Sequence, residues 1–132
     1  MLKLSAIMVL FMVLFSGTAL LAQPQDLQVV SAEFTKIDAN QDGAVIPAEM
    51  QAYQAMSFKG LDKDSNHELD PAELEADSTG MHQAADTDQD GRVTHRESAL
   101  KFNEYFEQMD KDQDGKVSEA EYTDYWKLIY KF

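Results

Sequence analysis

The sequence contains no cysteine, and this absence excludes several kinds of site. Without Cys there is no disulfide framework, thiol nucleophile, iron–sulfur cluster or thiolate zinc site. Basic residues are also scarce: 11 Lys and Arg stand against 24 Asp and Glu, which gives 132 residues a formal net charge of −13. Nucleic-acid-binding proteins place Lys and Arg against phosphates, so the charge argues against a nucleic acid partner. We expect stability to come from burial, or from a metal held by oxygen and nitrogen ligands.

Long apolar runs are also absent, except at the N-terminus. Lys3 is followed by an apolar stretch from Leu4 to Phe15, then by Ser16, Gly17 and small residues as far as Ala22. This order is typical of a secretory signal peptide. We therefore interpret residues 1–22 as a signal peptide, and we expect a secreted or periplasmic protein.

The cleavage position and the fate of this segment leave alternatives. Cleavage after Ala22 is favoured, and cleavage after Ala19 is the second choice. Because the apolar character extends to Leu21, an uncleaved helix that anchors the chain in a membrane is the competing interpretation. After cleavage, we expect no stable membrane insertion.

The rest of the chain is an internal repeat. Four acidic segments of 12 residues begin 24 residues apart: DANQDGAVIPAE at 38–49, DKDSNHELDPAE at 62–73, DTDQDGRVTHRE at 86–97 and DKDQDGKVSEAE at 110–121. A single unit of this size cannot bury its own apolar face, so the units must pack on one another. More than half of the 24 carboxylates fall at positions 1, 3, 5 and 12 of these segments, which a merely solvated acidic surface does not explain.

The residue types within each segment match the chemistry of a hard divalent cation. Calcium takes six to eight oxygen ligands, and a 12-residue loop can supply them from positions 1, 3, 5, 7, 9 and 12. The ligands predicted on this basis, with the position 7 residue acting through its carbonyl, are Asp38, Asn40, Asp42, Ala44 and Glu49 in loop 1; Asp62, Asp64, Asn66, Glu68, Asp70 and Glu73 in loop 2; Asp86, Asp88, Asp90, Arg92, Thr94 and Glu97 in loop 3; and Asp110, Asp112, Asp114, Lys116, Ser118 and Glu121 in loop 4.

These segments resemble the calcium loops of EF-hand proteins, with acids at alternate positions, Gly at position 6 and Glu at position 12. The resemblance covers residues 34–126 and implies helix–loop–helix units that bind calcium. The close spacing of the loops resembles short secreted bacterial proteins with four EF hands more than calmodulin, and distantly resembles dockerin modules. We expect an all-α fold with about five short helices and up to four calcium ions.

Two loops depart from the pattern. Ile46 at position 9 of loop 1 offers no oxygen, so we expect water to complete that shell. In loop 2, His67 replaces the glycine at position 6, and a non-glycine residue at positive φ costs about 1 kcal/mol. We therefore expect robust sites in loops 1, 3 and 4 and the weakest site in loop 2. His67 itself is not expected to bind metal, because side chains at position 6 point outward.

The segments between the loops are predicted to be amphipathic helices. Successive loops are 12 residues apart, and a helix of about 15 residues would hold them about 22 Å apart, at its two ends. Two loops joined in this way could not pair with each other. Asp77 to Gly80 supply helix-breaking residues, so we favour two halves, residues 23–78 and 79–132, although pairing of loops across the halves stays possible.

The apolar faces of these helices are compatible with two classes of function, a calcium sensor or buffer and a calcium-stabilised docking module. Met50, Met56, Met81 and Met109, beside Phe58, Phe102 and Phe106, could form a groove for a protein or peptide partner, or a closed core. The leading hypothesis is a non-catalytic calcium sensor or buffer outside the cytoplasm. The alternative is a calcium-stabilised docking or adhesion module. No catalytic motif is recognisable, so we do not expect an enzyme.

Overall fold

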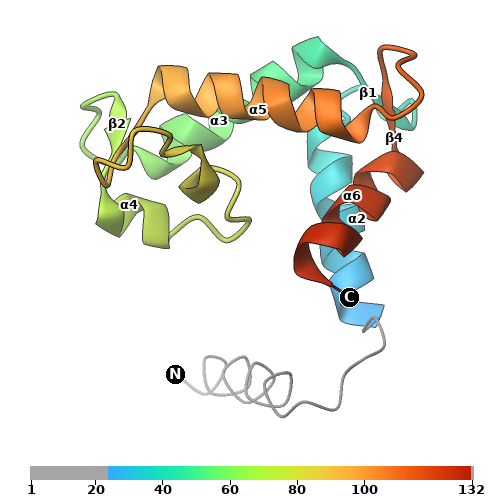
Figure 1. Cartoon of the computed structure of the whole chain (residues 1–132), viewed down its shortest axis with the longest axis horizontal. Coiled ribbons are helices and arrows are strands. Elements are labelled where there is room, and N and C mark those ends of the chain that lie inside the picture. The colour runs from blue at the N-terminus through green and yellow to red at the C-terminus, as the bar shows by residue number, and fades with distance from the viewer. Residues whose placement is uncertain (1–23, 132) are drawn as a thin grey trace.

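A computed structural model describes residues 24–131 and confirms the predicted all-α class. The described residues form five α-helices, one short 3₁₀ helix and four strands of two residues (Figure 1). In chain order these elements are α2 (Pro24–Ile37), β1 (Ala44–Val45), α3 (Pro47–Leu61), β2 (Glu68–Leu69), α4 (Pro71–Glu75), η1 (Gln83–Ala85), β3 (Val93–Thr94), α5 (His95–Met109), β4 (Val117–Ser118) and α6 (Glu119–Tyr130). The predicted signal peptide, with both cleavage positions, lies outside the described residues.

Helices α3 and α5 form the centre of the molecule and lie side by side in Figure 1. Each is 15 residues long and connects two loops: α3 connects loop 1 to loop 2, and α5 connects loop 3 to loop 4. Pro47 fits the first turn of α3, and Thr94 caps α5 by accepting a hydrogen bond from the Glu97 backbone N–H. The expectation that one unbroken helix joins loops 3 and 4 is confirmed.

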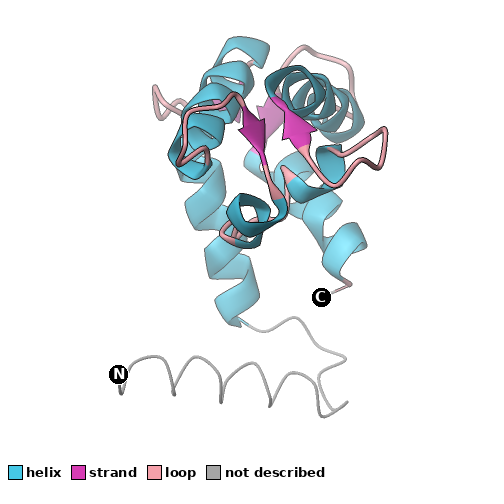
Figure 2. Cartoon of the chain, turned by 90° about the vertical axis from the view of Figure 1, so that its left-hand side faces the viewer, coloured by secondary structure: helices cyan, strands magenta, loops and turns pink. Residues whose placement is uncertain are grey.

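The loops pair in a non-sequential order. Strand β1 of loop 1 pairs antiparallel with β4 of loop 4, and β2 of loop 2 pairs antiparallel with β3 of loop 3. Loops joined by one long helix do not pair, as the helix length predicts. Figure 2, with the end that carries loops 2 and 3 toward the viewer, shows the short strands between the loops. Pairing therefore crosses the boundary drawn between the two predicted halves, while the division at 78/79 itself stays a prediction.

The helical structure is interrupted between loops 2 and 3, where the residues from Asp77 to Gly80 predict the end of a helix. Helix α4 ends at Glu75, and a turn leads to η1 just before loop 3. Asp77 organises this turn, because its carboxylate accepts hydrogen bonds from the backbone N–H groups of Thr79 (3.2 Å) and His82 (2.8 Å). The break lets the chain reverse, so loops 2 and 3 can face each other.

The core has two parts of unequal size. The larger cluster, at the end with loops 1 and 4, contains Val30, Phe34, Ile37, Val45, Met50, Tyr53, Met81, Phe102, Tyr105, Phe106, Met109, Val117, Tyr122 and Trp126. The smaller cluster, at the end with loops 2 and 3, contains Phe58, Leu69, Leu74, Ala85 and Val93. The residue at position 8 of every loop is buried in one of these clusters, so each strand pair joins its loops to a core.

The methionine and phenylalanine face predicted as a possible groove is closed in this structure. Met50, Met81 and Met109 are buried in the larger cluster, and Met56 alone of the four predicted methionines is exposed. Near the C-terminal end of α6, Ile129 is about half exposed. Among the described residues, no helix combines the length and the apolar character needed to cross a membrane.

Candidate metal centre in the acidic loops

The four acidic loops share one backbone conformation. In each loop the aspartate at position 1 accepts a hydrogen bond from the backbone N–H at position 6, at 2.9 Å in loop 1 and 3.0 Å in the other three. The side chain at position 5 likewise accepts from the N–H at position 7, at 2.8 to 3.0 Å. These bonds curl each loop around its own side chains, so the oxygens at alternate positions share one interior.

Position 6 has a left-handed backbone in every loop. Gly43, Gly91 and Gly115 have φ of 82° to 85°, and His67 has φ of 67° in loop 2. The structure therefore places His67 in the conformation that disfavours a side chain, as the sequence predicts. The His67 side chain is exposed, which agrees with the expectation that it points outward.

Position 4 also lies in the left-handed region in all four loops, which was not predicted from the sequence. The residues there are Gln41, Ser65, Gln89 and Gln113, with φ of 56° to 59°. No glycine marks this turn, so the usual sequence signal for positive φ is missing. Each loop thus has two left-handed positions, and in loop 2 alone both are occupied by residues with a side chain, Ser65 and His67.

The glutamate at position 12 closes each loop. Its carboxylate accepts a hydrogen bond from the backbone N–H at position 9, for example from Thr94 to Glu97 at 2.8 Å and from Ser118 to Glu121 at 2.9 Å. In loop 1, Glu49 also accepts from the Asn40 N–H, at 3.3 Å. The first turn of the exiting helix thus carries the position 12 carboxylate back over the start of its loop.

In each of three loops, acidic ligand atoms lie close enough together to bind the same cation. Within each group, one ligand atom from each residue lies within 4.8 Å of the others; the groups are Asp62, Asp64 and Glu73; Asp86, Asp88 and Glu97; and Asp110, Asp112 and Glu121. These nine residues are all predicted ligands. Every donor is a carboxylate oxygen, which suits calcium or magnesium rather than zinc or copper.

Electrostatics within the groups favours a bound cation. Desolvation, with nearby carboxylates, raises the pKa of Asp64 and of Asp112. The pKa of Asp88 is also raised: the hydrogen bond from the Asp90 backbone opposes this shift, but desolvation and the carboxylates of Asp86, Asp90 and Glu97 outweigh it. The Thr94 backbone N–H holds the pKa of Glu97 below its ordinary value. A divalent cation would relieve the repulsion among these carboxylates.

Loop 3 offers a direct test of whether a cation fits. Oδ1 of Asp86, at position 1, is buried and has no hydrogen-bond partner among the described residues. A buried carboxylate oxygen without a partner is costly. A cation among Asp86, Asp88 and Glu97 would supply that partner, so these residues fit calcium.

Loop 1 differs from the other three. It does not bring three acids together, because the residue at position 3 is Asn40. The Asn40 amide oxygen still faces the loop interior, where it accepts from the Asp42 N–H at 3.1 Å. Loop 1 thus replaces a charged oxygen with a neutral one, and Asp38, Asp42 and Glu49 remain as its charged predicted ligands.

The residue at position 9 has a second role that the ligand pattern did not reveal. Asp70, Thr94 and Ser118 cap the exiting helices by accepting a hydrogen bond from the position 12 N–H, at 2.9, 3.1 and 3.2 Å. Position 12 is always Glu and returns the bond to the position 9 backbone, which completes a capping box. Ile46 cannot cap, so α3 begins without a side-chain cap. The sequence signal was present: a polar residue three positions before Glu predicts this box.

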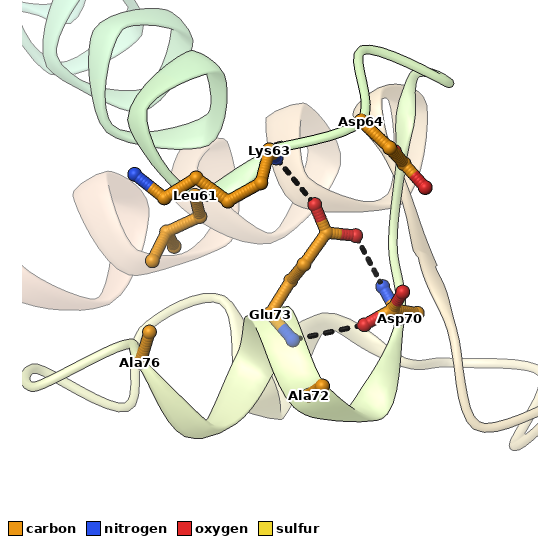
Figure 3. Close-up of a pocket in the computed structure, with 7 residues that line it drawn as sticks. All are labelled: Leu61, Lys63, Asp64, Asp70, Ala72, Glu73 and Ala76. Atoms are coloured by element: carbon orange, nitrogen blue, oxygen red, sulfur yellow. Dashed lines mark hydrogen bonds between the residues drawn. The ribbon is translucent and has the colours of Figure 1, made fainter.

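A pocket of about 290 Å³ adjoins loop 2 (Figure 3). Its acidic side is formed by Asp64, Asp70 and Glu73, and the other lining residues are Leu61, Lys63, Ala72 and Ala76. In Figure 3 the Glu73 carboxylate reaches from α4 toward the backbone nitrogens of Lys63 and Asp70. The acidic side belongs to the predicted ligand set of loop 2, so the pocket is part of that loop's site.

An ion pair links loops 2 and 3. Nη1 of Arg92 lies 3.2 Å from Oε2 of Glu68, and both residues stand at position 7 of their loops. The equivalent residues of loops 4 and 1 are Lys116 and Ala44, and Ala44 has no charge to offer. The sequence could not reveal this pair, because nothing local shows that loop 2 faces loop 3.

Comparison with known proteins agrees with this geometry. A protein-family model described as EF hand matches residues 83–97 and 102–124, which include loops 3 and 4 and most of α5. These two segments are therefore similar to EF hands. A search of curated proteins found no match to the chain. The helical fold, the matched segments and the acidic groups together indicate calcium binding.

Proposed function

We propose that this chain is a non-catalytic protein that binds calcium in up to four loops, acting as a buffer or sensor outside the cytoplasm. The observation that carries the proposal is the convergence of three acidic ligand atoms in each of loops 2, 3 and 4. The family match over loops 3 and 4 supports it independently. Loop 1 is included because its backbone is the same and its predicted ligands are oxygens.

The strength of the four sites follows from their residues. Loops 3 and 4 have acids at positions 1, 3, 5 and 12 together with glycine at position 6. Loop 1 has a neutral amide at position 3 and no oxygen in the side chain at position 9. Loop 2 carries the backbone cost of His67. We expect three robust sites, in loops 1, 3 and 4, and a weaker fourth site in loop 2.

The test is a calorimetric calcium titration of the chain beside the variants Glu97→Gln and Glu121→Gln. Each substitution keeps the size of the side chain and removes the carboxylate at position 12, so each variant should lose one tight site. Asp124→Asn is the matched control: Asp124 is an exposed acid on α6 outside the loops, and its loss should leave the stoichiometry unchanged. An unchanged titration in both position 12 variants would disprove the ligand assignment.

A second function, a calcium-stabilised structural or docking module, is favoured by one observation. The side chains that a sensor would expose, Met50, Met81, Met109, Phe58, Phe102 and Phe106, are all buried. Binding of a hydrophobic dye with and without calcium separates the two functions. A folded calcium-free state whose dye binding rises on loading supports a sensor. An unfolded calcium-free state and a loaded state that binds less dye support the structural or buffering role.

The location outside the cytoplasm rests on the order of residues in the first 22 positions. Mass spectrometry of the exported protein should find an N-terminus at Gln23, or at Leu20 if cleavage follows Ala19. Recovery of intact Met1 in a membrane fraction would instead support the anchored alternative.

A further inference from the structure

His82 occupies an unusual place in the repeat. Four residues before the first aspartate of their loops, the other three repeats have Phe34, Phe58 and Phe106. The third repeat has His82 there, and the side chain is only 1 % exposed. A histidine therefore fills a core position that the repeat otherwise gives to an aromatic hydrocarbon ring.

The His82 ring bridges the two central helices. Nε2 lies 2.8 Å from Oγ of Ser57 on α3, and Nδ1 lies 2.8 Å from Oγ of Ser98 on α5. The Gln54 side-chain amide donates to Ser98 Oγ at 3.0 Å, and the Ser57 hydroxyl donates to the backbone carbonyl of Gln54 at 3.1 Å. Four residues thus form a closed polar ring between α3, α5 and the start of η1.

These contacts assign one tautomer to His82. Because the Ser57 hydroxyl hydrogen goes to Gln54, Ser57 Oγ accepts from Nε2–H. In the neutral imidazole Nδ1 then carries no hydrogen, so it accepts from the Ser98 hydroxyl, whose oxygen accepts from Gln54. Every donor in the ring then has an acceptor, and the imidazole is neutral.

A second proton on His82 breaks this arrangement. The Ser98 hydroxyl could then no longer donate to Nδ1 and would have to turn its hydrogen to another acceptor. A cation would also lie in a site packed by Phe58 and Phe102, whose ring centroids are 6.0 and 4.9 Å from that of His82. Burial lowers the pKa of His82; the Asp77 carboxylate opposes this shift and His95 adds to it. The Asp77 carboxylate accepts hydrogen bonds from the Thr79 hydroxyl and from the His82 backbone N–H rather than from the ring nitrogens.

Of the titratable groups around this site, Asp77 favours a charge on the ring, but burial outweighs it. From α5, His95 packs its ring on Phe58 at 5.1 Å, and the Tyr105 hydroxyl donates to the Met81 carbonyl. From α3, the residues in contact with the ring are Ser57 and Phe58. The acid that lies near is Asp77, in the turn after α4. Protonation of His82 therefore disfavours the contact between α3 and α5.

The polar ring is connected directly to two calcium loops. His82 precedes η1, which leads into Asp86 at position 1 of loop 3. Ser98 follows Glu97, at position 12 of the same loop, and Ser57 lies on the helix that enters loop 2. Both ends of loop 3 are thus held together through His82 and Ser98.

We propose that His82 is a positioning residue for loop 3 and that its protonation releases the α3–α5–η1 contact and weakens calcium binding there. The inference rests on the proposed calcium function. His82 binds a proton more weakly when the α3–α5–η1 contact is formed than when it is released. The calcium affinity of loop 3 is therefore highest above the ordinary histidine pKa of about 6.5 and falls as the pH drops below that value. One linked proton can change the affinity by up to about tenfold per pH unit.

The test compares calcium titrations of the full chain at pH 8 and pH 5.5, followed by the NMR amide signals of Gly91 and Gly115, which report loops 3 and 4 separately. Loop 4 measures the ordinary effect of carboxylate protonation. We expect acid to weaken loop 3 about three- to tenfold more than loop 4. His82→Gln, which keeps a donor and an acceptor but does not titrate in this range, should abolish the difference.

The matched control uses the other two of the three histidines. In the double variant His67→Gln/His95→Gln, His82 is the sole histidine and the extra weakening of loop 3 should persist. The proposal is wrong if His82→Gln keeps that weakening or if the double variant loses it. No calcium binding at pH 8 in any variant would instead overturn the proposed function.

A measurement on the double variant covers the case in which His82→Gln does not fold. Its single imidazole can be titrated by NMR without calcium. We expect the ring to stay neutral below pH 6.5 and to become protonated only as the signals of α3 and α5 change. A ring that titrates near pH 6.5 with no change in these helices would contradict the inference, whether or not calcium binds.

Discussion

The two ends of the molecule use the same loop but surround it differently. At one end, loops 1 and 4 are paired and joined to α2 and α6, and they rest on the larger aromatic cluster. At the other end, loops 2 and 3 are paired but are joined to each other only by the five-residue α4, a turn and the three-residue η1. The core there has five buried residues.

The contrast shows that the ligand set of a loop and the size of the core beneath it vary independently. Loop 3 has a full set of acidic ligands, and yet it lies at the end with the smaller core. Loop 1 has fewer charged ligands, and it lies at the well-supported end. Because hydrophobic stabilisation grows with buried apolar area, we expect the end with loops 2 and 3 to open more readily and to depend more on calcium.

Core truncations at the two ends should have the largest effect. Trp126→Ala, in the larger cluster, is expected to lower the free energy of unfolding of the whole domain by about 3–5 kcal/mol. Leu69→Ala, in the smaller cluster, removes a buried leucine and should cost about 2–5 kcal/mol, mainly as local opening around loops 2 and 3. Chemical denaturation followed by circular dichroism, with hydrogen exchange of α4 and η1, checks both. If Leu69→Ala exposes every helix equally, the two ends form one cooperative unit.

An exchange of residues at position 6 should have an intermediate effect. His67→Gly is expected to tighten loop 2 about fivefold, because it removes about 1 kcal/mol of backbone strain. Gly91→His is the matched reverse change in loop 3, where an added Cβ meets no atom within 4 Å, so any weakening reports the backbone rather than a clash. Calcium titration of both variants provides the measurement. Equal affinities before and after the two exchanges would show that position 6 does not set the order of the sites.

The ion pair between the paired loops should have the smallest effect. Arg92→Ala removes the contact with Glu68 and is expected to cost about 0.2–1 kcal/mol, decreasing as salt is added, because both side chains are exposed. Lys116→Ala, at the equivalent position of loop 4, is the control, since its partner loop has Ala44 there. Thermal unfolding at low and high salt distinguishes the two variants, because only Arg92→Ala should show a salt-dependent loss of stability. An effect of Arg92→Ala that is independent of salt would indicate a packing role instead.

Local sequence determined the parts of this protein that lie within one loop or one helix. Each loop carries its ligands and its position 6 turn inside 12 consecutive residues, and loops 2, 3 and 4 also carry a capping box. The acids that converge in loops 2, 3 and 4 could therefore be named in advance. The same holds for α5, which runs unbroken from His95 to Met109, and for the break after α4. The left-handed turn at position 4 was the exception, because no glycine marks it.

Only the tertiary structure decided which loops face each other and what lies between the helices. Residues 45 and 117 are far apart in the sequence, and their pairing follows from the reversal of the chain between loops 2 and 3. That reversal sets α3 against α5, buries the predicted methionine face and encloses His82 between Ser57 and Ser98. The loops were predictable because their contacts are local, whereas the pairing and the polar ring depend on contacts between residues that the sequence keeps apart.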